Sequence, residues 1–167
     1  FWRAWQYFEK VKTFGAVPWY DEPIDPEDMA ALYKPRDSRE YVMERVLEDL
    51  DFACEHCYTS SDWINCARIN RYIALAYKAR VCLFEGTYRK YHQVDPSTGE
   101  AWVDKLASER FLRECVKACE ELMTAGIYTL VNNPAQVKTQ YRELFTQEAV
   151  NTAEVIWARQ MSVGMTT

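Results

Sequence analysis

Residues 70–86 read NRYIALAYKARVCLFEG, and this stretch decides the fold. Apolar residues occupy nearly every face of the helix that it would form, which is typical of a helix with neighbours on several sides. Its small residues let adjacent helices approach closely, as stacked helical pairs require, and they are Ala74, Ala76 and Ala79. We therefore expect a central helix from Asn70 to Glu85, ended by Gly86.

Three further stretches show apolar residues at helical spacing. They are residues 1–14 followed by Gly15, residues 38–57 opened by the capping pattern Asp37-Ser38-Arg39-Glu40, and a helix opened by Ser108 and closed by Gly126. The proline-rich residues 17–35 and the turn-rich residues 87–107 predict long loops. Weaker patterns predict a helical turn at residues 141–145 and an extended run at residues 154–159. The whole pattern predicts a mostly α fold of stacked helix pairs.

The 167 residues are enough for one folded unit with a sizeable core and too few for two full-sized domains. The formal charge of -5 disfavours a phosphate-binding surface, so we expect no nucleic acid partner. No apolar run approaches the roughly 18 residues that a bilayer crossing requires. Because Phe1 already falls within a helical pattern and no capping residue precedes it, we expect an internal part of a longer chain.

Six cysteines raise the question of a metal site or of disulfides. One pair lies in Cys54-Glu55-His56-Cys57, and Cys115 and Cys119 form another. Both pairs fall in predicted helices on or beside apolar faces, where free cysteine behaves as a small hydrophobe. We expect core packing with mainly free thiols and no metal or other cofactor. For an exported protein, the sequence does not choose among the possible disulfide pairings.

No catalytic or nucleotide-binding motif is recognisable in the chain. The five glycines form neither GxxxxGK nor GxGxxG, and HExxH and GxSxG are absent. No motif places a nucleophile beside His92, which we interpret as a surface histidine. We interpret the acidic residues of the second helix as a solvated face: Glu44, Glu48, Asp49 and Asp51. We expect no enzyme, although 25 acidic residues leave a two-carboxylate glycosidase open.

Aromatic residues in the predicted loops are candidates for ligand binding. Flat rings stack on the faces of sugars, and a few polar groups then fix the orientation of the ligand. The candidates are Trp19 in the proline-rich loop, Trp63 between the second and third helices, and Tyr88, Tyr91 and Trp102 in the loop after the central helix. For each ring, packing over the helix ends is at least as good an interpretation.

Several segments, taken in order, resemble the SusD/RagB family of bacterial surface nutrient-binding lipoproteins. They are residues 1–19 (FWRAWQYFEKVKTFGAVPW), 33–40 (YKPRDSRE), 48–51 (EDLD), 76–92 (AYKARVCLFEGTYRKYH), 125–130 (AGIYTL), 143–145 (ELF) and 154–157 (EVIW). The match is spread over almost the whole chain. Trp19 and Trp157 stand where the family more often has smaller apolar residues.

This resemblance implies a tetratricopeptide-like helical-repeat scaffold with long loops. It also implies a cell-surface protein of the outer membrane, held by a lipid anchor outside this segment, that captures a glycan or oligosaccharide. The implied partner is a SusC-like TonB-dependent transporter, to which the ligand is delivered for nutrient uptake. Two alternatives stay open: a RagB-like protein that binds peptides, and a helical-repeat scaffold that binds only protein partners.

Overall fold

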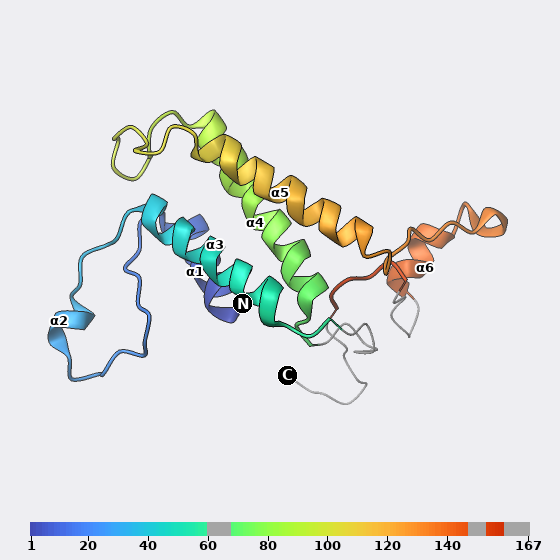
Figure 1. The fold of residues 1–167 in the computed structure, drawn as a ribbon, viewed down its shortest axis with the longest axis horizontal. Coiled ribbons are helices and arrows are strands. Elements are labelled where there is room, and N and C mark those ends of the chain that lie inside the picture. The colour runs from blue at the N-terminus through green and yellow to red at the C-terminus, as the bar shows by residue number, and fades with distance from the viewer. Residues whose placement is uncertain (60–67, 147–152, 159–167) are drawn as a thin grey trace.

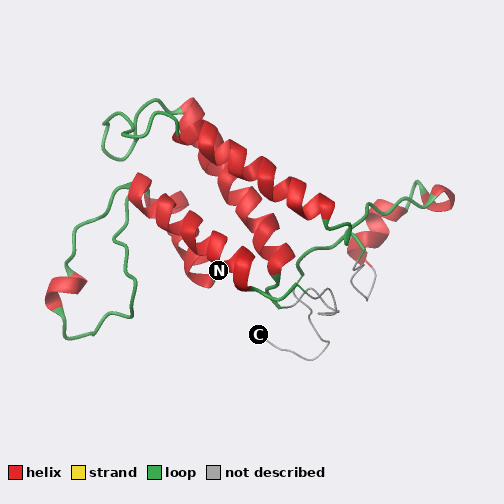
Figure 2. Ribbon diagram, in the orientation of Figure 1, coloured by secondary structure: helices red, strands yellow, loops and turns green. Residues whose placement is uncertain are grey.

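Helices dominate the described part of the chain, which comprises residues 1–59, 68–146 and 153–158 of the computed structural model (Figure 1, Figure 2). In chain order the elements are α1 (Trp2–Phe14), α2 (Met29–Leu32), α3 (Arg39–His56), α4 (Arg71–Tyr91), α5 (Ala107–Thr124), the 3-10 turn η1 (Pro134–Gln136) and α6 (Gln140–Thr146). Within these ranges the backbone forms no strand, only isolated bridges between Val17 and Asp37 and between Val94 and Ala101. The predicted mostly α fold is confirmed, whereas α2 was not predicted.

The four long helices pack in chain order, α1 against α3, α3 against α4 and α4 against α5. The predicted central helix, α4, therefore lies between α3 and α5 (Figure 1). One cluster of buried side chains, with Phe8, Leu50 and Phe111 among them, joins all four helices. A smaller cluster around Leu75 and Ala118 joins α3, α4 and α5. Burial of these apolar faces away from water is the main source of stability for helices packed in this way.

The close contact between α4 and α5 corrects two expectations. α4 does not end at Gly86 but continues to Tyr91, and Gly86 is buried in its interior. A Cβ atom at Gly86 would lie 2.7 Å from Leu112 Cγ, so the absence of a side chain lets α5 approach. Ser108 is not the cap of α5, because its hydroxyl donates to the carbonyl oxygen of Gly86 at 2.8 Å. The capping position is Leu106, which makes no side-chain hydrogen bond.

Three other helix ends follow the local signals in the sequence. Ser38 caps α3, since its hydroxyl oxygen accepts a hydrogen bond from the Tyr41 N–H at 3.2 Å. Asn70 caps α4 in the same way, and its side chain accepts from the Ile73 N–H at 2.9 Å. Gly15 follows α1 with a φ of 70°, a left-handed conformation that favours glycine.

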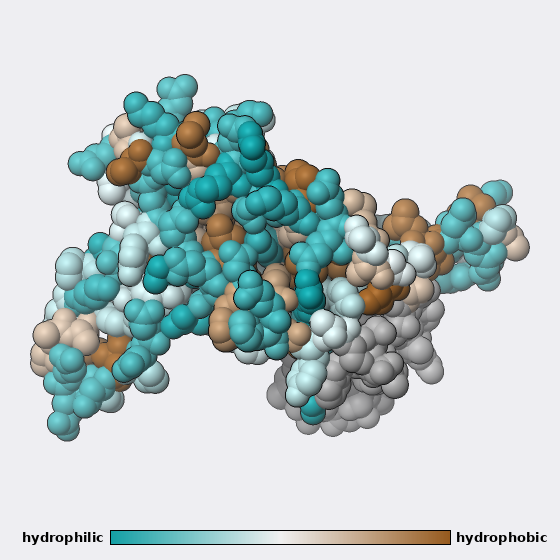
Figure 3. Space-filling model, in the orientation of Figure 1, coloured by the Kyte–Doolittle hydropathy of each residue, from teal (hydrophilic) through white to brown (hydrophobic). Residues whose placement is uncertain are grey.

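The segment after α5 differs in part from its prediction. The helical turn predicted at residues 141–145 lies within α6. Residues 153–158 form turns and bends, so the expected extended run at 154–159 is not a strand where it is described. No helix in the described ranges has the length and apolar character needed to cross a membrane. Figure 3 shows a mostly hydrophilic face with hydrophobic residues in small patches.

A buried ionic network occupies the end of the helices where α4 finishes and α3 and α5 begin, and we call this the closed end. Glu85 is 0% exposed and accepts hydrogen bonds from Arg39 Nη2 at 2.6 Å and from Arg89 Nε at 2.8 Å. Arg89 also donates to Glu40 at 3.2 Å, and its guanidinium lies 5.1 Å from the ring centre of Trp102. These charges compensate one another inside the protein, as buried charges must.

Candidate functional site

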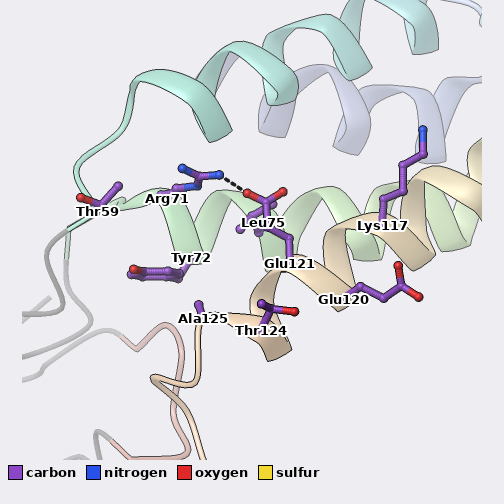
Figure 4. A pocket seen from close by; sticks show the side chains of 9 residues that line it. All are labelled: Thr59, Arg71, Tyr72, Leu75, Lys117, Glu120, Glu121, Thr124 and Ala125. Atoms are coloured by element: carbon purple, nitrogen blue, oxygen red, sulfur yellow. Dashed lines mark hydrogen bonds and ion pairs between the residues drawn. The ribbon is translucent and has the colours of Figure 1, made fainter.

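An open cleft of about 540 Å³ lies where α4 begins and α5 ends (Figure 4). Its lining combines one aromatic ring, two aliphatic side chains, four charged groups and two threonine hydroxyls: Thr59, Arg71, Tyr72, Leu75, Lys117, Glu120, Glu121, Thr124 and Ala125. Its volume lies within the range of small-molecule sites. The cleft is therefore the first candidate for a ligand site.

The polar groups of the cleft are reachable from solvent. Arg71 forms an ion pair with Glu121 across the cleft, and these side chains are 37% and 46% exposed (Figure 4). The half-buried ring of Tyr72 contacts Tyr128 edge-on, with 6.2 Å between ring centres. Leu75 is buried and joins the cleft to the core. A ligand here would meet one ring and charged groups that both donate and accept hydrogen bonds.

No sequence motif marks the cleft, and the four predicted ligand-binding residues in the described ranges do not line it: Trp19, Tyr88, Tyr91 and Trp102. Arg71 of α4 and Glu121 of α5 pair across the cleft, and they are 50 positions apart in the sequence. Only the capping residue Asn70, directly before Arg71 and Tyr72, indicates that these side chains belong to a first helical turn. Trp63, one of the predicted residues, lies outside the described part of the chain.

The other two predicted tryptophans are buried and hydrogen-bonded. Trp19 is 3% exposed, its ring centre lies 4.1 Å from that of Tyr7, and its indole N–H donates to Asp21 at 2.9 Å. Trp102 is 8% exposed, and its indole N–H donates to the His92 carbonyl oxygen at 2.5 Å. Both residues do lie in loops, but the loops fold back onto the helices and cover the rings.

The predicted location of Tyr88 and Tyr91 in a loop is wrong, because α4 continues through both residues. The ring of Tyr88 stacks on His92 at 4.2 Å, and the Arg39 guanidinium lies 3.8 Å from the centre of the Tyr88 ring. The structure brings Tyr88 and Trp102 together at 6.4 Å, at the closed end. Tyr91 is exposed on the last turn of α4. His92 is exposed as predicted.

The acidic residues of α3 were predicted to form a solvated face, and three of the four side chains are more than a third exposed, whereas Asp49 is 16% exposed. Each carboxylate forms an ion pair, and three of the four join α3 to another helix: Glu44 to Arg110 of α5, Asp49 to Arg3 of α1 and Asp51 to Lys78 of α4. Glu48 pairs with Arg45 on the same helix. Three of these carboxylates thus also contact neighbouring helices, through partly exposed ion pairs that each contribute little to stability.

The five cysteines in the described ranges pack as predicted among apolar side chains, and Cys66 lies outside those ranges. Cys54 and Cys82 are buried, and Cys57, Cys115 and Cys119 pack against the smaller cluster of the core. Burial raises the pKa of the Cys54 thiol and of the Cys82 thiol to about 12 in each case. These thiols therefore stay protonated at neutral pH and are weak nucleophiles. Among residues 1–59, 68–146 and 153–158, no three cysteine, histidine or carboxylate side chains are placed to hold a metal ion.

Comparison with known proteins adds no relative: no family model, no curated protein and no solved structure matches this chain. A functional conclusion therefore depends on the chemistry of the surface and on the sequence segments quoted above.

Proposed function

We propose that this chain binds an oligosaccharide at the outer-membrane cell surface and delivers it to a SusC-like TonB-dependent transporter. In this proposal the protein is not an enzyme, needs no cofactor and is held at the membrane by a lipid anchor outside the described segment. The SusD/RagB-like order of sequence segments supports the location and the partner. The observation that carries the binding role is the open cleft of Figure 4, with its single ring and its solvent-accessible charges.

The lining of the cleft suits the chemistry of a sugar. The face of Tyr72 offers a stacking surface for the C–H groups of a pyranose ring. Arg71 donates hydrogen bonds and Glu121 accepts them, so neighbouring hydroxyls of one sugar can contact both. Because the cleft is open, we expect moderate affinity and fast release, which suit hand-over to a transporter.

The test is calorimetric titration of the full chain with a glycan array hit, followed by substitution of the ring. Tyr72→Ala removes the stacking surface, and we expect it to weaken binding at least about tenfold. Tyr33→Ala is the matched control, because Tyr33 is an exposed tyrosine outside the cleft. Equal affinities of Tyr72→Ala and the unaltered chain would move the site elsewhere.

A protein-binding scaffold is the second candidate function, and the outer side of α5 favours it. α5 packs on α4, whereas Leu106, Val116 and Met123 are exposed. A groove of about 380 Å³ runs beside Val116 and is bordered by Arg113 and Lys117. If the chain binds only proteins through this face, Val116→Asp should abolish co-purification of the protein partner from native membranes, and the unaltered chain should bind no arrayed glycan. An unchanged yield of the co-purified protein would reject this surface.

A further inference from the structure

The loop between α1 and α3 carries an acidic projection with an apolar tip, which we call the α2 knob and define as residues 21–32 (DEPIDPEDMAAL). It extends away from the packed helices (Figure 1). The knob holds five carboxylates and neither lysine nor arginine. Of these carboxylates, Asp21 alone forms an ion pair with another described residue, Arg3. Met29 and Leu32 lie one helical turn apart in α2 and are 57% and 47% exposed.

Hydrogen bonds fix the base of the knob on both sides. The hydroxyl of Tyr20, directly before the knob, donates to the carbonyl oxygen of Ala31 at 2.5 Å. Within the knob, the carboxylate of Asp28 caps α2 by accepting from the Ala31 N–H at 3.0 Å. After the knob, the Lys34 ammonium donates to the carbonyl oxygen of Trp19 at 2.8 Å. An ordered projection of this kind loses little conformational freedom when it binds a partner.

The groove on the outer side of α5 has the opposite charge, and we call it the α5 groove. Its volume is about 380 Å³, and its lining residues are Glu109, Leu112, Arg113, Val116 and Lys117. This lining has two cations against one carboxylate. The side chains of Arg113 and Lys117 are 73% and 68% exposed, and each pairs with a carboxylate of α5 itself. Such exposed pairs are weak, so an incoming carboxylate can share these cations.

The α2 knob and the α5 groove lie well apart in one chain (Figure 1). The knob belongs to the connection between α1 and α3, whereas α5 packs on the other side of α4. The knob of a chain therefore does not reach its own groove. A second copy of the chain, in contrast, brings an acidic apolar knob to a basic apolar groove, so one molecule supplies both halves of a complementary contact.

We propose that the α2 knob of one chain docks in the α5 groove of a second copy. Met29 and Leu32 then lie against Val116, and the carboxylates of the knob lie beside Arg113 and Lys117. The apolar side chains leave water on contact, and the flanking opposite charges orient the approach. Because two different surfaces meet, the contact is head-to-tail, and every added copy leaves one knob and one groove free for the next.

This self-association goes beyond glycan binding and does not depend on it. Lys117 is the one residue that the α5 groove shares with the cleft of Figure 4. The substitutions that test the contact therefore leave the cleft residues Arg71, Tyr72 and Glu121 in place. The contact also gives the outer side of α5 a definite partner, a second copy of this chain.

The experiment is sedimentation velocity of the full chain at rising concentrations, up to about 1 mM, because a contact between two small surfaces is weak. The unaltered chain should associate beyond the dimer as its concentration rises. The knob variant combines Met29→Asp with Leu32→Asp, and the groove variant is Val116→Asp. Each variant alone should stay monomeric. Val103→Asp is the matched control, since Val103 is an exposed valine outside the groove, and it should associate like the unaltered chain.

An equal mixture of the knob variant and the groove variant is the decisive sample. It retains one intact groove and one intact knob, so it should form a one-to-one dimer and nothing larger. Arg113→Glu, added to the knob variant whose groove is intact, should weaken this mixed dimer at least about tenfold. Circular dichroism of each variant confirms folding.

Three results would overturn the head-to-tail contact. They are an unaltered chain that stays monomeric at every concentration, association that survives Val116→Asp, and a mixture of the two variants that stays monomeric. A monomeric chain that binds an arrayed glycan would reject this inference and leave the proposed function intact. A chain that associates as expected and binds no glycan would support this inference and reject the proposed function.

Discussion

Charged and aromatic side chains are buried at one end of the helix bundle and partly exposed to water at the other. At the closed end, Glu85 and both of its arginine partners are withdrawn from water, and the indole of Trp102 donates to a backbone carbonyl. At the end where α4 begins and α5 ends, which we call the open end, the Arg71–Glu121 pair is partly exposed, and so are the rings of Trp2 and Trp157. The same residue types are thus buried at one end and reachable from solvent at the other.

The difference has a physical reason. Buried charges cost stability unless they are paired, and Glu85 pairs with both arginines of the closed end, although Arg89 Nη2 makes no hydrogen bond within the described residues. An exposed ion pair contributes little to stability, and hydroxyls of a ligand can replace the water around it. Substitutions at the open end should therefore cost the fold little, whereas substitutions at the closed end should cost much.

The largest expected effect is on the closed end. Glu85→Ala leaves the guanidinium groups of Arg39 and Arg89 buried without their shared carboxylate. We expect a loss of about 3–5 kcal/mol in the free energy of unfolding, as for other buried pairs that lose one partner. Urea denaturation followed by circular dichroism measures this loss.

The control for Glu85→Ala is Glu109→Ala, because Glu109 pairs with Arg113 on the exposed side of α5. That substitution should cost less than about 1 kcal/mol. Similar losses of unfolding free energy for the two variants would contradict the description of the closed end as a buried ionic network.

The second effect compares two tryptophans directly. Trp102→Ala removes a buried ring and its cation–π contact with Arg89, so we expect a loss of about 3 kcal/mol or more. Trp2→Ala removes a largely exposed ring and should cost less than about 1 kcal/mol. Thermal melts of both variants provide the measurement. A large loss for Trp2→Ala would mean that this exposed ring serves packing.

The elements of the fold were predictable because their signals are local. Apolar spacing and capping residues predicted the four long helices, with Ser38 and Asn70 at two of their starts. Gly86 was misread as a helix end, because a sequence cannot show that Leu112 would pack onto it. That misreading also put Tyr88 and Tyr91 into a loop.

The candidate sites were not predictable because they depend on contacts between distant segments. Arg71 and Glu121, which pair across the cleft, are 50 positions apart, and no spacing rule relates them. Periodicity alone placed residues 1–14 in a helix without showing which of its rings would remain exposed. The position of Trp19 in a loop was predicted, but not its burial against Tyr7.

The third effect concerns pH and the buried thiols. The pKa values of Cys54 and Cys82 rise to about 12 in the folded chain, whereas an unfolded thiol ionises near the ordinary value of 9. The unfolded state therefore loses these protons first, so stability is fully present below about pH 9 and falls toward pH 12. Each thiol contributes at most about 1.4 kcal/mol per pH unit to this fall. Urea midpoints at pH 8 and pH 10.5 measure this fall in stability. Cys54→Ser should make the stability depend less steeply on pH. An unchanged pH dependence would mean that the pKa of Cys54 is ordinary.

The smallest effect tests whether the open end is as ordered as the closed end. Ser38 caps α3 at the closed end and Asn70 caps α4 at the open end, so each substitution by alanine should cost about 1 kcal/mol. Hydrogen exchange of the Tyr41 and Ile73 amides reports each end separately. Equal protection of the two amides before substitution would mean that the first turn of α4, which carries Arg71 and Tyr72, is held rigidly before any ligand binds. Much faster exchange at Ile73 would mean that the cleft forms only as α4 becomes ordered, and binding would then be weakened by the cost of that ordering.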